Sequence, residues 1–99
     1  MQSLGMFALR CKRYQIVRVR QPLTADGVDC DGTCDPRDLP RPRITVGQGL
    51  TDERELDVFI HEMLHACFWD LDETSIEEAA SDIAKVLFKI GYRKGLTSR

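Results

Sequence analysis

The sequence has no apolar stretch that approaches the roughly 20 residues of a membrane-spanning helix. Its first residues, MQSLGMFALR, lack the order of a signal peptide, in which a basic, an apolar and a small-residue segment follow one another. Neither an internal repeat nor a low-complexity segment is present. These absences predict a cytoplasmic protein without a membrane partner.

The charges give little indication of a partner, because the net charge of the 99 residues is only −2. They are nevertheless unevenly distributed: residues 1–20 carry five bases and no acid, whereas residues 51–83 carry eleven acids and one base. A basic segment can bind nucleic acid, but such binding usually comes with a basic domain. We therefore expect a solvated strand face and no nucleic-acid partner.

Cysteine is sparse, with Cys11, Cys30, Cys34 and Cys67 spread along the chain. In the cytoplasm thiols are kept reduced, so disulfides are not expected. The C-x3-C spacing of Cys30 and Cys34 suits a second zinc site poorly. The sequence therefore predicts four free thiols, whose role it does not define.

The first half of the chain predicts two strands separated by a loop. YQIVRVR, residues 14–20, alternates apolar with basic positions and is rich in β-branched residues, which indicates a strand with one solvated face. Residues 21–42 contain all four prolines, which exclude a long helix or a central strand and indicate a turn-rich loop. RITVGQ, residues 43–48, predicts the second strand.

The second half predicts two helices. The first should run from Asp52 to Phe68, capped by Thr51 or Asp52 and followed by acids in its first turn. The second should begin near Thr74 or Ser75, where T-x-x-E fits a capping box, and should end before a left-handed Gly91.

These elements predict a single α+β domain over residues 1–99. Residues 1–50 would supply the strands and the loop, and residues 51–92 the two helices. We expect a small sheet packed on the first helix, with the second helix following it.

HEMLH, residues 61–65, contains both histidines of the chain and matches the pattern H-E-x-x-H. On a helix, His61 and His65 lie within about 40° of each other, so their imidazoles can bind one zinc ion. Glu62 lies at the edge of the same site, where it can act as general base toward a zinc-bound water. Because the helix is apolar on both sides, two unpartnered buried imidazoles would be costly, which favours zinc.

A catalytic zinc ion usually has three protein ligands, and no third histidine exists. The acids that follow the motif are Asp70, Asp72, Glu73, Glu77, Glu78 and Asp82. The first three lie in the predicted turn between the helices, and Glu77 is expected to serve the helix cap. Glu78 and Asp82 are one turn apart, in the phase of a ligand and a supporting group, although their stripe of charges is also typical of a solvated face. Glu77 remains the alternative third ligand.

EAASD, residues 78–82, downstream of H-E-x-x-H resembles the E-x-x-x-D helix of the gluzincin metallopeptidases, the thermolysin-like group. The resemblance covers residues 52–92 and implies a zincin-like fold, with Glu78 as the third zinc ligand and Asp82 orienting a ligating histidine. The chain also looks like small metallopeptidase-like proteins of phages and bacteria, in which a strand, HExLHA and a closing GYR follow one another. If a phage encodes it, the cytoplasm would be that of the host.

Two departures from the gluzincin pattern stand out. The gap between His65 and Glu78 is short, which leaves no room for a substrate-binding insertion. The subdomain that in the gluzincin family supplies the tyrosine or histidine stabilising the oxyanion has no counterpart in these 99 residues, and only Tyr14 or Tyr92 offers itself in that role.

The leading interpretation is a zinc-dependent metallopeptidase that hydrolyses peptide bonds of a peptide or protein substrate, with Glu62 as catalytic base. The substrate would pair with a free edge of RITVGQ. The alternative is a non-catalytic, zinc-stabilised binding module, for example a phage accessory protein, in which Glu62 is incidental. A DNA-linked protease fits less well, because such proteins resemble three-histidine sites. The sequence does not define the oligomeric state.

Overall fold

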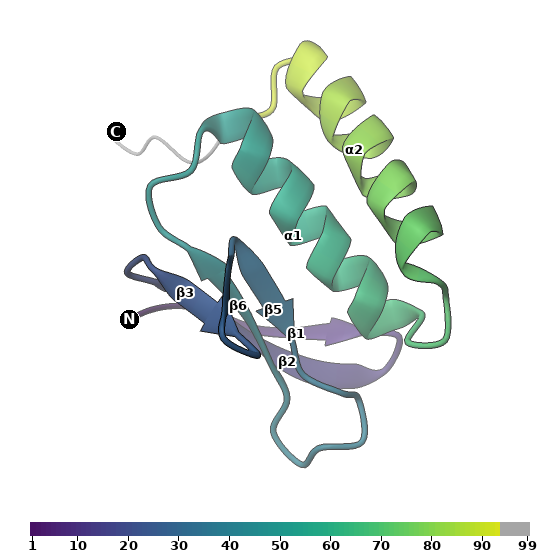
Figure 1. Ribbon diagram of the computed structural model, residues 1–99. Coiled ribbons are helices and arrows are strands. Elements are labelled where there is room, and N and C mark those ends of the chain that lie inside the picture. Colours follow the sequence, from purple (N-terminus) through teal and green to yellow (C-terminus); the bar gives the residue numbers. More distant parts are fainter. Residues whose placement is uncertain (94–99) are drawn as a thin grey trace.

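The computed structural model describes residues 1–93, which form two sheets and two helices (Figure 1). The α+β prediction is confirmed. The predicted domain continues to residue 99, and its last six residues lie outside the described part. In chain order the elements are β1 (Gln2–Leu9), β2 (Lys12–Val19), β3 (Leu23–Ala25), β4 (Val28–Cys30), β5 (Gly32–Cys34), β6 (Arg43–Gly47), α1 (Asp52–Cys67) and α2 (Glu73–Lys89).

The main sheet has the strand order β1-β2-β6-β5, and β3 and β4 form a separate hairpin. β2 runs parallel to β6, whereas β1 and β5 are antiparallel to their neighbours. β6 therefore has partners on both sides, so the predicted free edge of RITVGQ is wrong. In the described part of the chain, the free edge beside α1 belongs to β5, whose Gly32 and Cys34 pair with Val46 and Ile44.

The sequence predicted two of the six strands. The loop at residues 21–42 contains β3, β4 and β5, but its prolines do keep it out of the sheet centre. The sequence does not predict strand β1, because its side chains are mostly exposed or half-buried without a clean alternation. Its register with β2 also shifts between Ser3 and Gly5. A strand with no buried face carries no period-2 hydrophobic signal.

Helix α1 lies between the sheet and α2, so the structure has three layers (Figure 1). One face of α1 packs on a core formed by Tyr14, Ile16, Ile44, Val46, Val58 and Ala66. On the other side α2 presents the buried residues Ile76, Ala80 and Ala84. Small residues on α2 allow the two helices to approach closely, which fixes the helical hairpin that carries HEMLH.

The ends of the helices agree closely with the sequence. Thr51 caps α1, its hydroxyl accepting from the Arg54 amide at 3.3 Å, and Gly91 ends α2 with a φ of +109°. The cap of α2 was predicted wrongly: Asp72 and not Thr74 is the N-cap residue, and its carboxylate accepts from the Ser75 amide at 2.9 Å. Helix α2 therefore begins at Glu73.

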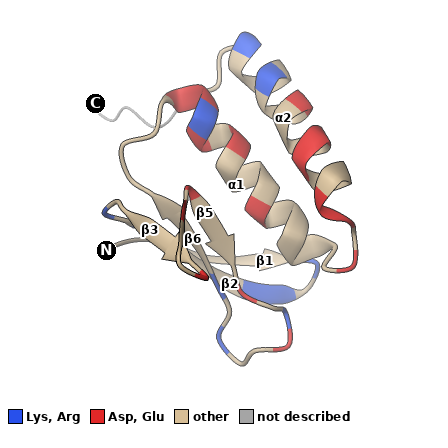
Figure 2. Ribbon diagram, viewed as in Figure 1, with Lys and Arg blue, Asp and Glu red and all other residues tan. Residues whose placement is uncertain are grey.

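Acidic residues lie along both helices, with a few basic residues among them, and basic residues lie on β2 (Figure 2). The expectation of a wholly solvated basic strand face is wrong for Arg18. Its guanidinium donates two hydrogen bonds of 2.9 Å to the carboxylate of Glu55, a residue of α1 that is 3% exposed. This bidentate pair ties β2 to the first turn of α1. In residues 1–93, neither helix has both the length and the apolar character needed to cross a membrane.

Candidate metal centre

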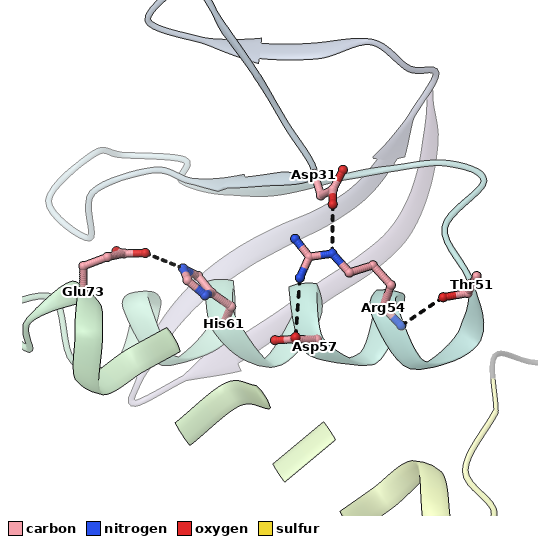
Figure 3. Close-up of polar contacts among 6 residues, drawn as sticks. All are labelled: Asp31, Thr51, Arg54, Asp57, His61 and Glu73. Atoms are coloured by element: carbon pink, nitrogen blue, oxygen red, sulfur yellow. Dashed lines mark hydrogen bonds and ion pairs between the residues drawn. The ribbon is translucent and has the colours of Figure 1, made fainter. Parts of the chain in front are cut away.

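Three donor groups converge between the last turns of α1 and the first turn of α2. The Nε2 atoms of His61 and His65 lie 3.2 Å apart. Glu73 Oε2 lies 2.9 Å from His61 Nε2 (Figure 3). The other oxygen of the same carboxylate, Oε1, lies 2.8 Å from His65 Nε2. Among residues 1–93, no other three histidine, cysteine or acidic side chains converge in this way.

This arrangement fits a zinc ion. Zinc binds imidazole nitrogen and carboxylate oxygen at about 2.0–2.2 Å, so neighbouring ligands of a tetrahedral site are separated by about 3.3 Å. The 3.2 Å between the two imidazole nitrogens is close to that edge length, and Glu73 places one carboxylate oxygen within 2.9 Å of each ring. Two imidazoles and one carboxylate would occupy three corners and leave the fourth open, as in catalytic rather than closed structural sites.

The third donor is Glu73 and not the predicted Glu78. Residue 73 lies within about 20° of the centre of the α2 face that Ile76, Ala80 and Ala84 turn toward α1, whereas residue 78 lies about 160° from it. Glu78 is exposed and borders a surface hollow together with Glu77, Ser81 and Asp82. The ligand prediction therefore shifts to Glu73. The supporting role of Asp82 and the alternative ligand Glu77 receive no support from this geometry.

The turn between the helices, residues 68–72, holds Glu73 in place. The Phe68 amide donates to Leu64 O at 2.8 Å, and the Leu71 amide donates to Phe68 O at 3.0 Å. Asp72 then caps α2, and the Ser75 amide that it accepts from lowers the pKa of the Asp72 carboxyl. Although Glu73 is 60% exposed, its backbone is thus fixed at the first position of a capped helix.

Glu62 lies beside the three donors and is 8% exposed. Burial, and then the negative charge of Glu73, raise the pKa of the Glu62 carboxyl to about 7. Gly32 of β5 makes this position possible: a Cβ there would lie 2.6 Å from Val58 Cγ1 and 3.1 Å from Glu62 Oε2. The edge strand therefore passes directly over the carboxyl group, which sits where a general base could meet a bound peptide.

Two adjoining hollows of about 230 and 280 Å³ share Gly32, His61, Glu62 and Glu73 as walls. The first extends toward Arg54, whose guanidinium binds Asp31 at 2.8 Å and Asp57 at 3.4 Å (Figure 3). The second extends toward Cys34, His65 and Trp69. The candidate metal centre thus opens into a shallow trough along β5, charged at one end and aromatic at the other.

Neither predicted oxyanion-stabilising tyrosine lies at the centre. Tyr14 is fully buried in the core, where its hydroxyl donates to Asp35 O at 3.1 Å and burial raises its pKa to about 12. Tyr92 is exposed and follows the C-terminal end of α2, whereas Glu73 lies at the N-terminal end of that helix.

The four cysteines are free, as predicted. Cys34 lines the trough, but burial, together with the charge of Glu62, raises the pKa of its thiol to about 12. A thiol that keeps its proton is a poor metal ligand and nucleophile. Cys34 therefore acts as a neutral wall of the trough.

The sequence did not predict Gly32 and Trp69 as site residues, and it placed Glu73 in the turn between the helices. A signal for Glu73 was present, because a short turn between antiparallel helices places the first turn of the second helix opposite the last turns of the first. Gly32 gave no such signal, since only the fold brings β5 over Glu62.

Comparison with protein-family models, with curated proteins and with solved structures finds no match to this chain. The interpretation of the site therefore depends on its own geometry.

Proposed function

We propose that the protein is a zinc-dependent metallopeptidase of the zincin kind, with His61, His65 and Glu73 as zinc ligands and Glu62 as the catalytic base. The observation that carries the proposal is the convergence of three donors at a surface hollow, next to a buried carboxyl that is not itself a donor.

The roles of the residues follow from their positions. When bound, zinc would polarise the scissile carbonyl and make water more acidic. Glu62 would accept a proton from the attacking water at a carboxylate oxygen and pass it to the leaving amine. In the metal-free chain, burial and the charge of Glu73 raise the pKa of Glu62 to about 7, so its carboxyl group can hold a proton near neutral pH.

The free edge of β5 supplies the means to hold a substrate. Within residues 1–93, Gly32, Thr33 and Cys34 pair with β6 on one side only, so the other side offers backbone groups to an extended peptide. Because Gly32 lies against Glu62, a peptide paired with β5 would pass the carboxyl and the three donors. Main-chain pairing of this kind is tolerant of sequence.

The test is a mixed peptide library, analysed by mass spectrometry after incubation with zinc-loaded wild type, with Glu62→Gln and with a chelated sample. Glu62→Gln should keep its zinc and lose at least about 10²- to 10⁴-fold in cleavage rate, the usual contribution of a general base. Equal cleavage by wild type and Glu62→Gln would trace the activity to a contaminating protease and contradict the proposal.

The alternative is a zinc-stabilised binding module without catalysis. The shallowness of the trough favours it, because its hollows of about 230 and 280 Å³ are smaller than most small-molecule sites. In that case zinc serves to hold the helical hairpin. Full zinc occupancy without cleavage of any library peptide would support this alternative.

A further inference from the structure

Three large apolar side chains are nearly half exposed on the turn after α1: Phe68 at 45%, Trp69 at 44% and Leu71 at 45%. They border a hollow of about 440 Å³, here called the aromatic hollow, which is also lined by Arg10, Arg37, Cys67 and Asp70. Clustered apolar surface on a polar rim is a common mark of an interaction site. The mechanism proposed above makes no use of it.

The aromatic hollow borders the candidate metal centre at Trp69. Trp69 lines both the aromatic hollow and the arm of the trough that holds His65, and the two rings lie 6.3 Å apart between centroids. Cys34 of the edge strand lines the same arm. A peptide that extends along β5 past Cys34 is therefore directed toward Trp69.

Hydrogen bonds hold the floor of the aromatic hollow in shape. Arg37 donates to the carbonyls of Ala66 at 2.6 Å and Leu9 at 2.8 Å, which ties the end of α1 to the end of β1. The guanidinium of Arg10 lies 5.0 Å from the centroid of the Phe68 ring. Arg10 and Arg37 thus hold the walls of the hollow in place before a ligand binds. Binding therefore does not require these side chains to be ordered, which favours affinity.

The direction of β5 decides which part of a peptide reaches the aromatic hollow. β5 runs from Gly32, beside Glu62, to Cys34, on the side of Trp69. Antiparallel pairing is the slightly more stable kind, and a peptide paired in this way runs from the Trp69 end toward the Arg54 end of the trough. Residues before the scissile bond then lie near the aromatic hollow, and residues after it lie near Arg54.

We propose that the aromatic hollow binds a large apolar side chain, such as Leu or Phe, located on the N-terminal side of the bond that is cleaved. This specificity rests on the proposed peptidase function. It assigns the substrate class as peptides with an apolar residue before the cleavage site and a polar or charged segment after it.

The cleavage test uses short end-blocked peptides in which Leu, Phe or Ser occupies each position in turn. Zinc-loaded wild type should prefer Leu or Phe before the scissile bond by about tenfold in kcat/KM, the lower range for an apolar pocket. Trp69→Ala should lose this preference. Phe7→Ala is the matched control, since Phe7 is also 45% exposed but lines a separate hollow against Phe59 and Met63, so this variant should keep the preference.

A binding test does not depend on turnover. Trp69 is the only tryptophan of the chain, so its fluorescence reports on the aromatic hollow directly. In zinc-loaded Glu62→Gln, peptides with Leu or Phe should shift this fluorescence to shorter wavelength, and their serine counterparts should not. The shift should survive Phe7→Ala.

The outcomes separate this inference from the peptidase proposal. Cleavage with an unchanged preference in Trp69→Ala, or with the apolar preference after the scissile bond, overturns the inference and leaves the peptidase standing. A fluorescence shift with peptides, without cleavage by wild type, supports binding of apolar side chains in the aromatic hollow and overturns the peptidase proposal. If neither a fluorescence shift nor cleavage is observed, both the inference and the peptidase proposal are overturned. If phosphatidylcholine vesicles shift the fluorescence and peptides do not, the hollow binds lipid and the inference is overturned.

Discussion

The two helices contribute to the candidate metal centre in different ways. Helix α1 is covered on both faces and supplies His61, Glu62 and His65 from its middle and last turns. Helix α2 supplies one residue, Glu73, which is 60% exposed at its first position. The core thus fixes two donors, whereas a turn and a cap fix the third, and substitutions on the two sides should differ accordingly.

The largest effect is expected from the α1 side. Replacing His61 or His65 by Ala should abolish stoichiometric zinc binding, measured by native mass spectrometry. Zinc at about 1,000 times its Kd stabilises the folded state by about 4 kcal/mol, so the zinc-dependent rise in Tm should vanish with it. Phe7→Ala is the control and should keep both. Full zinc occupancy in His61→Ala would refute the site.

The α2 side is tested by three neighbouring glutamates. Glu73→Gln should weaken zinc binding by more than the about 10- to 100-fold that a mere supporting group contributes. Glu77→Gln and Glu78→Gln should bind zinc as wild type does, because both side chains are exposed away from the histidines. Competition with a fluorescent chelator measures all three affinities. A loss confined to Glu78→Gln would restore the ligand that the sequence favoured.

Gly32→Ala tests how closely β5 lies over α1. Its Cβ would meet Val58 Cγ1 at 2.6 Å, so the strand or the helix must move. Overpacking of this kind costs about 1–3 kcal/mol, measurable by urea unfolding of the metal-free protein. Gly27→Ala is the control for loss of a glycine, since nothing lies within 4 Å of a Cβ there, although its φ of +78° adds strain. A neutral Gly32→Ala would show that the edge strand lies farther from Glu62.

The smallest effect concerns the cap of α2. Hydrogen bonds from Ser75 lower the pKa of Asp72, so its carboxylate stabilises the folded state above its unfolded pKa of 3.8. That contribution disappears as the pH falls through the lowered folded value. Asp72→Ala should therefore lower the Tm of the metal-free protein at pH 7 and approach wild type at acidic pH. Asp70→Ala, in the same turn, should show no such convergence.

The sequence predicted the half of the site that is local. H-E-x-x-H on an apolar helix is a periodic signal, and the structure brings His61, Glu62 and His65 together at one hollow. The capping pattern of Thr74 and Glu77 predicted a later start for α2 and left Glu73 in the turn before it. The sequence therefore favoured Glu78 as the third ligand. Asp72 was the better cap, and the start of the helix set which acid faced the histidines.

The rest of the site arises from contacts between segments distant in sequence. Gly32 over Glu62 joins residues thirty positions apart, and β5 is too short to show a period. The missed strand β1 is comparable, because its pairing with β2 depends on a partner and not on a buried face of its own. A hydrophobic pattern in a sequence reflects which side chains are buried, whereas strands β1 and β5 are positioned mainly by backbone pairing with their neighbours.

The position of all three donors within residues 61–73 has a consequence for folding. The segment that the ion would close is short, so its loop-closure entropy is small and involves neither the sheet nor the β3–β4 hairpin. Zinc could therefore order the helical hairpin while the strands are still unpaired, and the hairpin would give the later, long-range strand pairing a surface on which to assemble. The ion would then set the order of folding events as well as the final stability.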